Sequence, residues 1–215
     1  MIRLDKYLAD MGCGTRQEVK KLIRSGQVSV NGAVVKKPET KVEQTVQEVC
    51  LNGEKVGYES FEYYMLNKPA GVISATEDRS CQTVVDLIQE KKRKDLFPVG
   101  RLDKDTEGLL LITNDGELAH RLLSPKKHVD KCYFARVSGK VTEDDVRSFE
   151  NGVNIGSLEQ PEITMPGKLE IITSDEISQI HLTIQEGKFH QVKRMFRAVG
   201  KEVIYLKRLR MGTLV

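Results

Sequence analysis

The segment that decides the fold is GRLDKDTEGLLLITNDG, which occupies residues 100–116. Its first half is polar and bounded by Gly100 and Gly108, and an apolar run from Leu109 to Ile112 follows. Such a run predicts a buried strand, and loops carried on rigid elements are where functional side chains concentrate. We therefore expect Asp103 to lie on a firmly mounted loop. The alternative is a turn whose Asp and Gly residues only shape the backbone.

Length, cysteine usage and hydropathy set the general class of protein. The 215 residues are enough to bury a core and fit one or two domains, of which we expect two. The four cysteines are far apart and form no Cys-x-x-Cys pair, so we expect reduced thiols, no zinc site and no disulfide framework. No apolar leader and no apolar run of roughly 20 residues occurs, so we expect a cytoplasmic protein that does not enter a membrane.

Charge is unevenly distributed along the chain. The net charge is +3, but residues 1–41 carry nine bases against four acids and residues 187–215 carry eight bases against one acid. These ends contribute +5 and +7, which leaves −9 for the residues between them. Clustered cations at both ends favour a polyanionic partner, because they release counterions from a phosphate backbone. Solubilising surface charge is the alternative, and it is sufficient for the run KKRK at residues 91–94.

The N-terminal segment has the pattern of a small α+β module. Leu4, Tyr7, Leu8 and Met11 have the spacing of one helical face, which predicts a helix over about residues 3–11. A second helix is expected from the capping box at residues 15–18 to Gly26, followed by two short strands joined by Asn31-Gly32. A closing strand is expected within residues 44–62, before the linker. Four bases share the solvent face of the second helix: Arg16, Lys20, Lys21 and Arg24.

A second signature is EGKFHQVKRMF at residues 186–196, which joins a strand to a helix. The apolar side chains Val192, Met195, Phe196 and Val199 have helical spacing and are expected to pack inward, with Gly200 ending the helix. The opposite flank is cationic and carries His190, Lys193, Arg194 and Arg197. Each of these can be a solvated surface group, and a lone His more commonly has a local hydrogen-bonding role.

The remaining elements are expected from shorter patterns. Strands are expected at residues 63–73 on either side of a Pro/Gly turn, at 131–137 and at 202–211, where Lys207, Arg208 and Arg210 are expected at the edge. Helices are expected at residues 83–90, from Asp115 to the stop at Ser124-Pro125, and from Thr142 onward, with hairpins over 162–186.

Four motifs together resemble the bacterial ribosomal RNA pseudouridine synthases. They are the segment 100–116, the Asn-Lys-Pro-x-Gly stretch at 67–71, Lys131-x-Tyr133 and the segment 186–196. Residues 1–46 resemble the S4 RNA-binding domain. The resemblance implies an α+β protein: an S4-like domain at 1–46, a linker at 47–61, and a catalytic domain at 62–215 with a mixed, mostly antiparallel sheet flanked by helices.

The resemblance also implies roles for individual residues. Asp103 matches the nucleophile, Lys193 its cationic partner, and Tyr133 the ring that stacks on the target base, although a strand tyrosine is more often core packing. RNA contacts are expected from Arg16, Lys20, Lys21, Arg24, Arg101, His190, Arg194 and Arg197. The reaction requires neither a metal nor an organic cofactor. We expect a monomer whose partner is ribosomal RNA, free or within a partly assembled small subunit. The His-Gln-Val-Lys-Arg-Met form of the last motif is more similar to the 16S branch than to the 23S branch.

Three other functions compete with this interpretation. Asp103-x-Asp105-x-Glu107-Gly108 begins like a calcium loop, but Asn114 stands at the twelfth position, where a bidentate Glu is required. A hydrolase is disfavoured because the sequence contains no Gly-x-Ser-x-Gly, His-Glu-x-x-His or phosphate-loop pattern. The remaining competitor is a non-catalytic protein that docks on ribosomal RNA. The Asp, Tyr and Lys in their motifs argue against it.

Overall fold

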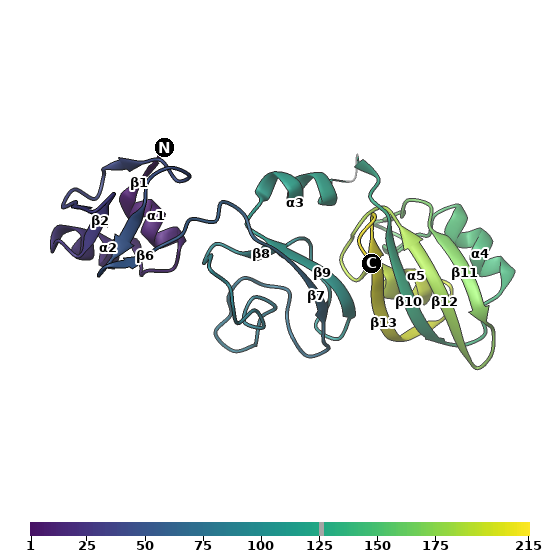
Figure 1. Ribbon diagram of the computed structural model, residues 1–215. Coiled ribbons are helices and arrows are strands. Elements are labelled where there is room, and N and C mark those ends of the chain that lie inside the picture. The colour runs from purple at the N-terminus through teal and green to yellow at the C-terminus, as the bar shows by residue number, and fades with distance from the viewer. Residues whose placement is uncertain (125–126) are drawn as a thin grey trace. The chain divides into compact units, whose positions relative to one another are not determined.

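The computed structural model describes residues 1–124 and 127–215, and the chain divides into two compact units. Unit 1 comprises Met1–Glu62 and Ile88–Leu96, and unit 2 comprises Tyr63–Leu87 and Phe97–Val215. The chain therefore returns to unit 1 once after it has entered unit 2 (Figure 1).

Unit 1 has two helices and two small sheets. Its elements are β1 (Ile2–Arg3), α1 (Leu4–Asp10), α2 (Arg16–Arg24), β2 (Val28–Val30), β3 (Ala33–Val34), β4 (Lys41–Val42), β5 (Val49–Leu51) and β6 (Glu54–Lys55). The sheet orders are β3-β2-β5-β6 and β1-β4. The predicted capping box begins α2, since the Thr15 amide donates to Glu18 Oε2 at 2.7 Å and the Glu18 amide to Thr15 Oγ1 at 3.3 Å.

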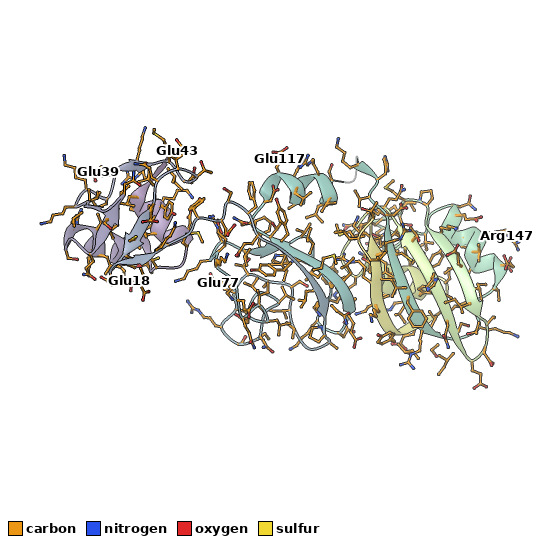
Figure 2. All side chains as sticks on the ribbon, viewed as in Figure 1. Glu18, Glu39, Glu43, Glu77, Glu117 and Arg147 are labelled. Carbon is orange, nitrogen blue, oxygen red and sulfur yellow. The ribbon has the colours of Figure 1, made fainter. Side chains whose placement is uncertain are left out.

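The core of unit 1 forms where the apolar faces of α1 and α2 meet the sheet, with Leu4, Leu8, Val19 and Ile23 at 0% exposure. Figure 2 shows Glu18, Glu39 and Glu43 at the periphery of unit 1, whereas Asp5 of α1 is 1% exposed. The expected helix–helix–hairpin order is present, and β2 and β3 pair across the Asn31-Gly32 turn, where both residues have positive φ.

Two expectations for the end of unit 1 need correction. The closing strand expected within residues 44–62 is β5, which pairs with β2, but β6 follows it in the same sheet, so the linker assigned to residues 47–61 is shorter than expected. The basic run at 91–94 is not only solvated charge. Arg93 is 3% exposed, donates to Asp95 and to the carbonyl oxygen of Glu59, and lies 3.6 Å from Asp10. These contacts place the segment Ile88–Leu96 in unit 1.

Unit 2 is built on a seven-stranded sheet. Its elements are β7 (Tyr63–Lys68), β8 (Phe97–Pro98), β9 (Glu107–Thr113), α3 (Gly116–Leu123), β10 (Lys131–Ser138), α4 (Glu143–Glu150), β11 (Lys168–Thr173), β12 (Ile177–Ile184), α5 (Gln191–Ala198) and β13 (Glu202–Met211). The strand order is β11-β12-β10-β13-β9-β7, and β8 also pairs with β9. All of these pairings are antiparallel except β13 with β9, which confirms a mixed, mostly antiparallel sheet.

Helices α4 and α5 lie against strands of this sheet (Figure 1). Phe149 of α4 and Phe196 of α5 are both fully buried, and their ring centroids are 5.0 Å apart. The apolar face predicted for α5 is thus confirmed for Val192, Met195 and Phe196, which are all buried. The charged side chain of Arg147 is on the outer side of α4 (Figure 2).

The parallel contact between β9 and β13 depends on a glycine. It consists of two residue pairs, Lys207 with Glu107 and Arg208 with Gly108. A Cβ at Gly108 would be 2.1 Å from the Arg208 carbonyl oxygen, and Gly108 has φ +101°. No other residue fits this approach without moving the strands, so the glycine of the segment 100–116 is required by the sheet itself.

The helix expected at residues 83–90 is absent, and this prediction is wrong. The Thr83 amide donates to Asp86 Oδ2 at 2.8 Å and the Asp86 amide to Thr83 Oγ1 at 3.3 Å, so side chains close a turn instead. The cap of α3 is confirmed, because the Leu118 amide donates to Asp115 Oδ1 at 2.9 Å. Pro125, expected to stop that helix, lies outside the described residues.

Candidate active site

The Asp103 loop connects β8 to β9. Its backbone accepts hydrogen bonds from side chains at the end of β7 and in the turn that follows. Lys68 is 1% exposed, and its Nζ donates to the carbonyl oxygens of Pro69, Lys104 and Thr106 at 3.0, 3.2 and 2.8 Å. Ser74 Oγ donates to the Leu102 carbonyl oxygen at 2.8 Å and accepts from the Leu102 amide at 3.0 Å. The backbone on both sides of Asp103 is therefore fixed by these hydrogen bonds.

Asp103 and Lys193 lie together although they are far apart in the sequence. Lys193 Nζ, on α5, is 3.1 Å from Asp103 Oδ2 and 2.6 Å from Asp105 Oδ1. The side chains of Lys193 and Asp103 are 21% and 24% exposed, whereas that of Asp105 is 73% exposed. His190 Nε2 is 3.5 Å from the other oxygen of Asp103. One ammonium group is thus shared by two carboxylates, and the sequence did not indicate the second of them.

The charge state of this cluster follows from its contacts. Burial by itself would lower the pKa of Lys193, but hydrogen bonds to Asp105 and Asp103 outweigh it and the pKa is raised above the ordinary 10.5. The hydrogen bond from Lys193 lowers the pKa of Asp105 below its ordinary range. Lys193 is therefore a permanent cation at neutral pH. Beneath the loop, burial lowers the pKa of Lys68.

A cavity of about 610 Å³ opens beside Asp103, within the roughly 300–1,000 Å³ typical of ligand sites. A smaller recess of about 70 Å³ adjoins the same residue. Arg101, Asp103, Tyr133 and His190 line both, and Lys193 lines the recess. Tyr133 is only 8% exposed, and in the sheet it is paired with Leu182 and Arg208. Tyr133 is therefore a core residue that also borders the cavity, and its stacking on a target base stays a prediction.

Two polar side chains that the sequence analysis did not assign to the site are buried there. Arg208 is 2% exposed and lines the larger cavity, where its Nε donates to the Leu109 carbonyl oxygen at 2.7 Å. Thr106 is 1% exposed and lines the recess. Within the described residues, Arg208 Nη2 and Thr106 Oγ1 have no hydrogen-bond partner. Buried polar groups of this kind are commonly completed by a ligand or water.

Arg208 had been expected at a sheet edge, but β13 lies between β10 and β9. The alternation of side chains along β13 could have predicted that Arg208 is buried. Leu206 and Arg208 are two residues apart and therefore share a face, and both are buried. An arginine in the register of a core leucine is a signal of a functional or structural role.

The residues expected to contact RNA differ in their exposure and in their contacts with the rest of the protein. Arg101 is exposed and borders the cavity, and Arg197 is exposed on α5. Arg194 is instead committed to the protein, since its Nη2 donates to Glu162 Oε2 at 2.6 Å and to the Ile155 carbonyl oxygen at 2.7 Å. In unit 1, the α2 bases are the exposed Arg16, Lys21 and Arg24 and the half-buried Lys20.

Neither a metal-ion cluster nor a membrane-spanning helix occurs in the described residues. No group of three or more His, Cys, Asp or Glu side chains is placed to hold a metal ion. No helix in residues 1–124 and 127–215 is both long and apolar enough to span a bilayer.

Comparison with known proteins identifies the class of protein. Residues 62–198 match the model of the RNA pseudouridylate synthase family, and residues 2–48 match that of the S4 domain. The chain therefore belongs to the RNA pseudouridylate synthase family, and its unit 1 carries an S4 domain. This assigns an isomerase activity.

Relatives are similar over nearly the whole chain. An uncharacterized RNA pseudouridine synthase of Bacillus subtilis is 53% identical over 98% of this chain and 88% of its own length. The ribosomal large subunit pseudouridine synthase B of Bacillus subtilis is 43% identical, with 97% and 84% covered. The ribosomal small subunit pseudouridine synthase A of Vibrio cholerae is 40% identical, with 98% and 89% covered. A crystal structure of a pseudouridylate synthase superposes with a TM-score of 0.66 at 36% identity, covering 100% of this chain and 90% of that one.

Proposed function

We propose that this protein converts one uridine of ribosomal RNA, in the 16S molecule, to pseudouridine, with Asp103 as the nucleophile. The observation that carries the proposal is the Asp103 carboxylate, 3.1 Å from the Lys193 ammonium and beside a cavity bordered by Tyr133, in a member of this enzyme family. The relatives include both small-subunit and large-subunit enzymes at similar identity. The choice of 16S therefore depends on the His-Gln-Val-Lys-Arg-Met segment.

The proposed reaction conserves every atom. The Asp103 carboxylate attacks ribose C1′, and the bond from C1′ to uracil N1 breaks with its electron pair leaving on the base. The base turns within the cavity, and C5 attacks C1′ and displaces the carboxylate. C5 then loses its proton and N1 gains one. A carboxylate suits this step as it does in glycoside cleavage, and the Lys193 ammonium 3.1 Å away balances its negative charge.

The remaining groups bind and orient the RNA. A uridine within folded RNA must leave its stack to reach Asp103, and the face of Tyr133 holds the extruded base. Arg101 contacts the RNA at the cavity. The α2 bases of unit 1 supply phosphate contacts that are independent of sequence. No step in this scheme calls for a metal or an organic cofactor.

The test is to map pseudouridine in ribosomal RNA from cells that lack the gene and to restore either the wild-type gene or Asp103→Asn. The near-isosteric variant retains the shape of the side chain without its charge. We expect one 16S pseudouridine to disappear and to return only with the wild-type gene. A missing site in 23S RNA would correct only the choice of subunit. An unchanged pseudouridine map, or full rescue by Asp103→Asn, would contradict the proposal.

The substrate state is a separate question for the same strain. Its protein-free 16S RNA and its partly assembled small subunits can each be incubated with purified enzyme. The proposal predicts turnover on at least one of the two, and the faster one identifies the stage of assembly at which the enzyme acts.

A further inference from the structure

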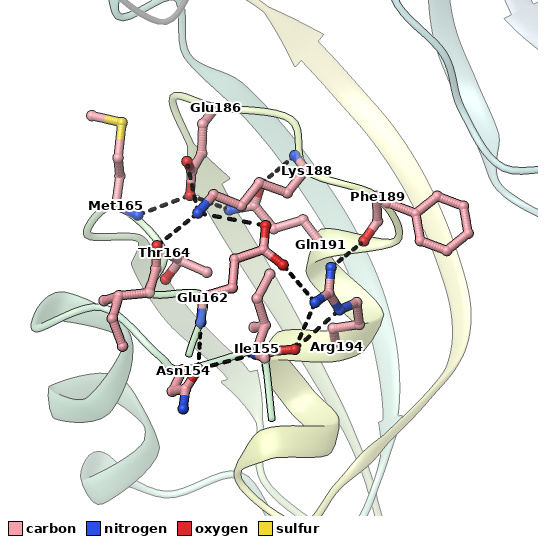
Figure 3. A network of polar contacts seen from close by, with 12 residues as sticks. Asn154, Ile155, Glu162, Thr164, Met165, Glu186, Lys188, Phe189, Gln191 and Arg194 are labelled. Atoms are coloured by element: carbon pink, nitrogen blue, oxygen red, sulfur yellow. Dashed lines mark hydrogen bonds and ion pairs between the residues drawn. The ribbon is translucent and has the colours of Figure 1, made fainter. Parts of the chain in front are cut away.

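The loop at residues 185–190, between β12 and α5, presents the side chain of Phe189 outward beside the cavity. Its backbone is braced on the inside. Arg194 Nη1 donates to the Phe189 carbonyl oxygen at 3.1 Å, and the Lys188 amide donates to Gln191 Oε1 at 2.8 Å. Gln191 Nε2 in turn donates to the buried Glu186 carboxylate at 2.7 Å. Figure 3 shows the Phe189 ring pointing away from this network, so the contacts fix the backbone and leave the ring presented to the outside.

The Phe189 ring is stacked on the ring of the next residue. The ring centroids of Phe189 and His190 are 3.9 Å apart, and the ring planes differ by 16°. The His190 backbone is left-handed, with φ 48°, which is uncommon for a residue other than glycine. Two consecutive side chains therefore form one layered aromatic pair instead of diverging.

This aromatic pair extends outward from the reacting carboxylate. His190 Nε2 is 3.5 Å from Asp103, and Phe189 lies on His190. The exposed fraction rises along the same path, from 24% for the Asp103 side chain to 43% for the His190 side chain and 70% for Phe189. Both rings line the cavity that Tyr133 and Asp103 also line. The outer face of the Phe189 ring is thus available to a group that lies next to the target base.

Exposure alone would not distinguish Phe189, because Leu158 is 99% and Ile163 57% exposed in the same unit. Location and charge distinguish it. The cavity that it borders is also lined by Arg101 and Lys104, both exposed cations, so a group that enters here meets positive charge beside a flat apolar ring. That combination favours a nucleotide over a protein side chain, since bases stack on aromatic faces while cations contact the phosphates.

We infer that the Phe189–His190 pair is a stacking platform for the nucleobase adjacent to the target uridine, and so a positioning element for that uridine. Extruding a uridine leaves its neighbour without a stacking partner on one side, and the outer face of Phe189 replaces the lost contact. This inference rests on the proposed function. The pair would favour RNA in which the neighbouring base is unstacked, and it would accept any of the four bases, because every base has a π-face.

The experiment measures RNA affinity and single-turnover rate for Phe189 variants of the full chain. The RNA is a transcript that spans the mapped uridine, together with two versions in which the nucleotide on either side of it is abasic. Phe189→Ala should weaken binding of the intact RNA about tenfold. Phe189→Tyr should bind like wild type, and Phe189→Leu should resemble Phe189→Ala, because Leu is apolar but has no flat face. Leu158→Ala is the matched control for loss of an exposed apolar side chain, and it should change nothing.

The abasic transcripts separate stacking from other effects. If Phe189 stacks on one neighbour, wild-type protein should lose the same affinity when that base is removed, and Phe189→Ala should then cause no further loss. Equal losses by Phe189→Ala on all three transcripts would overturn the inference, as would no loss on the intact RNA. A wild-type protein that forms no pseudouridine would contradict the proposed function instead, so the two failures are distinguishable.

Discussion

Replacement of Lys193 by Met tests the central ion pair, because it keeps much of the side-chain volume and removes the cation. The expected loss of rate can be estimated from the contacts of Lys193. Lys193 Nζ is 3.1 Å from Asp103 and 2.6 Å from Asp105, but the side chain of Asp105 is 73% exposed and its interaction is screened by water. The contact with Asp105 is the shorter and raises the pKa of Lys193 more, but the rate depends on the partly buried contact with Asp103, because Asp103 is the proposed nucleophile. A hydrogen bond between charged groups contributes about 1.5–3 kcal/mol, and a loss of about 2 kcal/mol corresponds to a rate lower by about 30-fold.

The assay is single-turnover formation of pseudouridine at saturating RNA, with affinity measured separately. We expect Lys193→Met to lower the rate and to leave affinity nearly unchanged. Arg197→Met on the same helix is the matched control, since Arg197 is exposed and should affect affinity and not rate. Asp105→Asn leaves the contact between Lys193 and Asp103 in place and should cost much less than Lys193→Met. If saturating RNA restores the full rate of Lys193→Met, the lysine is a phosphate contact and the ion-pair argument fails.

The pH dependence of the wild-type enzyme follows from the same contacts. The pKa of Lys193 is raised above 10.5, so its pairing with the two carboxylates is fully present below that value and is lost only when the pH rises through the higher, folded-state pKa. The single-turnover rate should therefore show no alkaline decline up to about pH 9.5. An alkaline decline that begins below about pH 9.5 in the wild-type enzyme and is absent from Lys193→Met would contradict the raised pKa of Lys193.

Three further predictions concern the scaffold and the RNA grip. Gly108→Ala should destabilise the fold by more than about 3 kcal/mol in urea titrations, whereas Gly116→Ala, where no atom is within 4 Å of the new Cβ, should be near neutral. Lys68→Met removes a donor shared by three carbonyl oxygens, of which that of Lys104 still accepts from the Gly71 amide, so it should cost about 2–4 kcal/mol in the same assay and also slow the reaction. Wild-type stability would contradict the support of the Asp103 loop. Changing Arg16, Lys20, Lys21 and Arg24 to Glu should flatten the dependence of log affinity on log salt by about 0.7–0.9 per lost phosphate contact, and an unchanged slope would identify the α2 face as solubilising charge.

Local chemistry made the helices and caps predictable from the sequence. The Thr15–Glu18 capping box and the Asp115 cap depend on residues three positions apart, and both form as expected. The same reasoning failed at residues 83–90, where four apolar residues with helical spacing had to compete with a Thr83–Asp86 turn. A window of eight residues is too short for periodicity to decide between these outcomes.

The pairing of Asp103 with Lys193 was expected only through the family resemblance, because no local pattern connects positions so far apart. Asp105 as a second partner of Lys193 was not foreseen, since it depends on the side-chain positions of a folded loop. The return of Ile88–Leu96 to unit 1 was missed for a similar reason. Burial of Arg93 is possible only where Asp95, Asp10 and the Glu59 carbonyl oxygen converge, and a basic run in the sequence gives no sign of such partners.

Gly108 matters to both the fold and the active site, because it lies where the two groups of elements that carry the site residues meet. Asp103 is on the loop that enters β9, whereas Tyr133, Lys193 and Arg208 belong to β10, α5 and β13. In the described part of the chain, the sheet joins these two groups of elements through two residue pairs, and Gly108 is in one of them. The separation of Asp103 from Lys193 is therefore set by the approach of the Gly108 and Arg208 backbones. A substitution that only moved these strands apart would weaken the ion pair and slow the reaction even where the protein still folded.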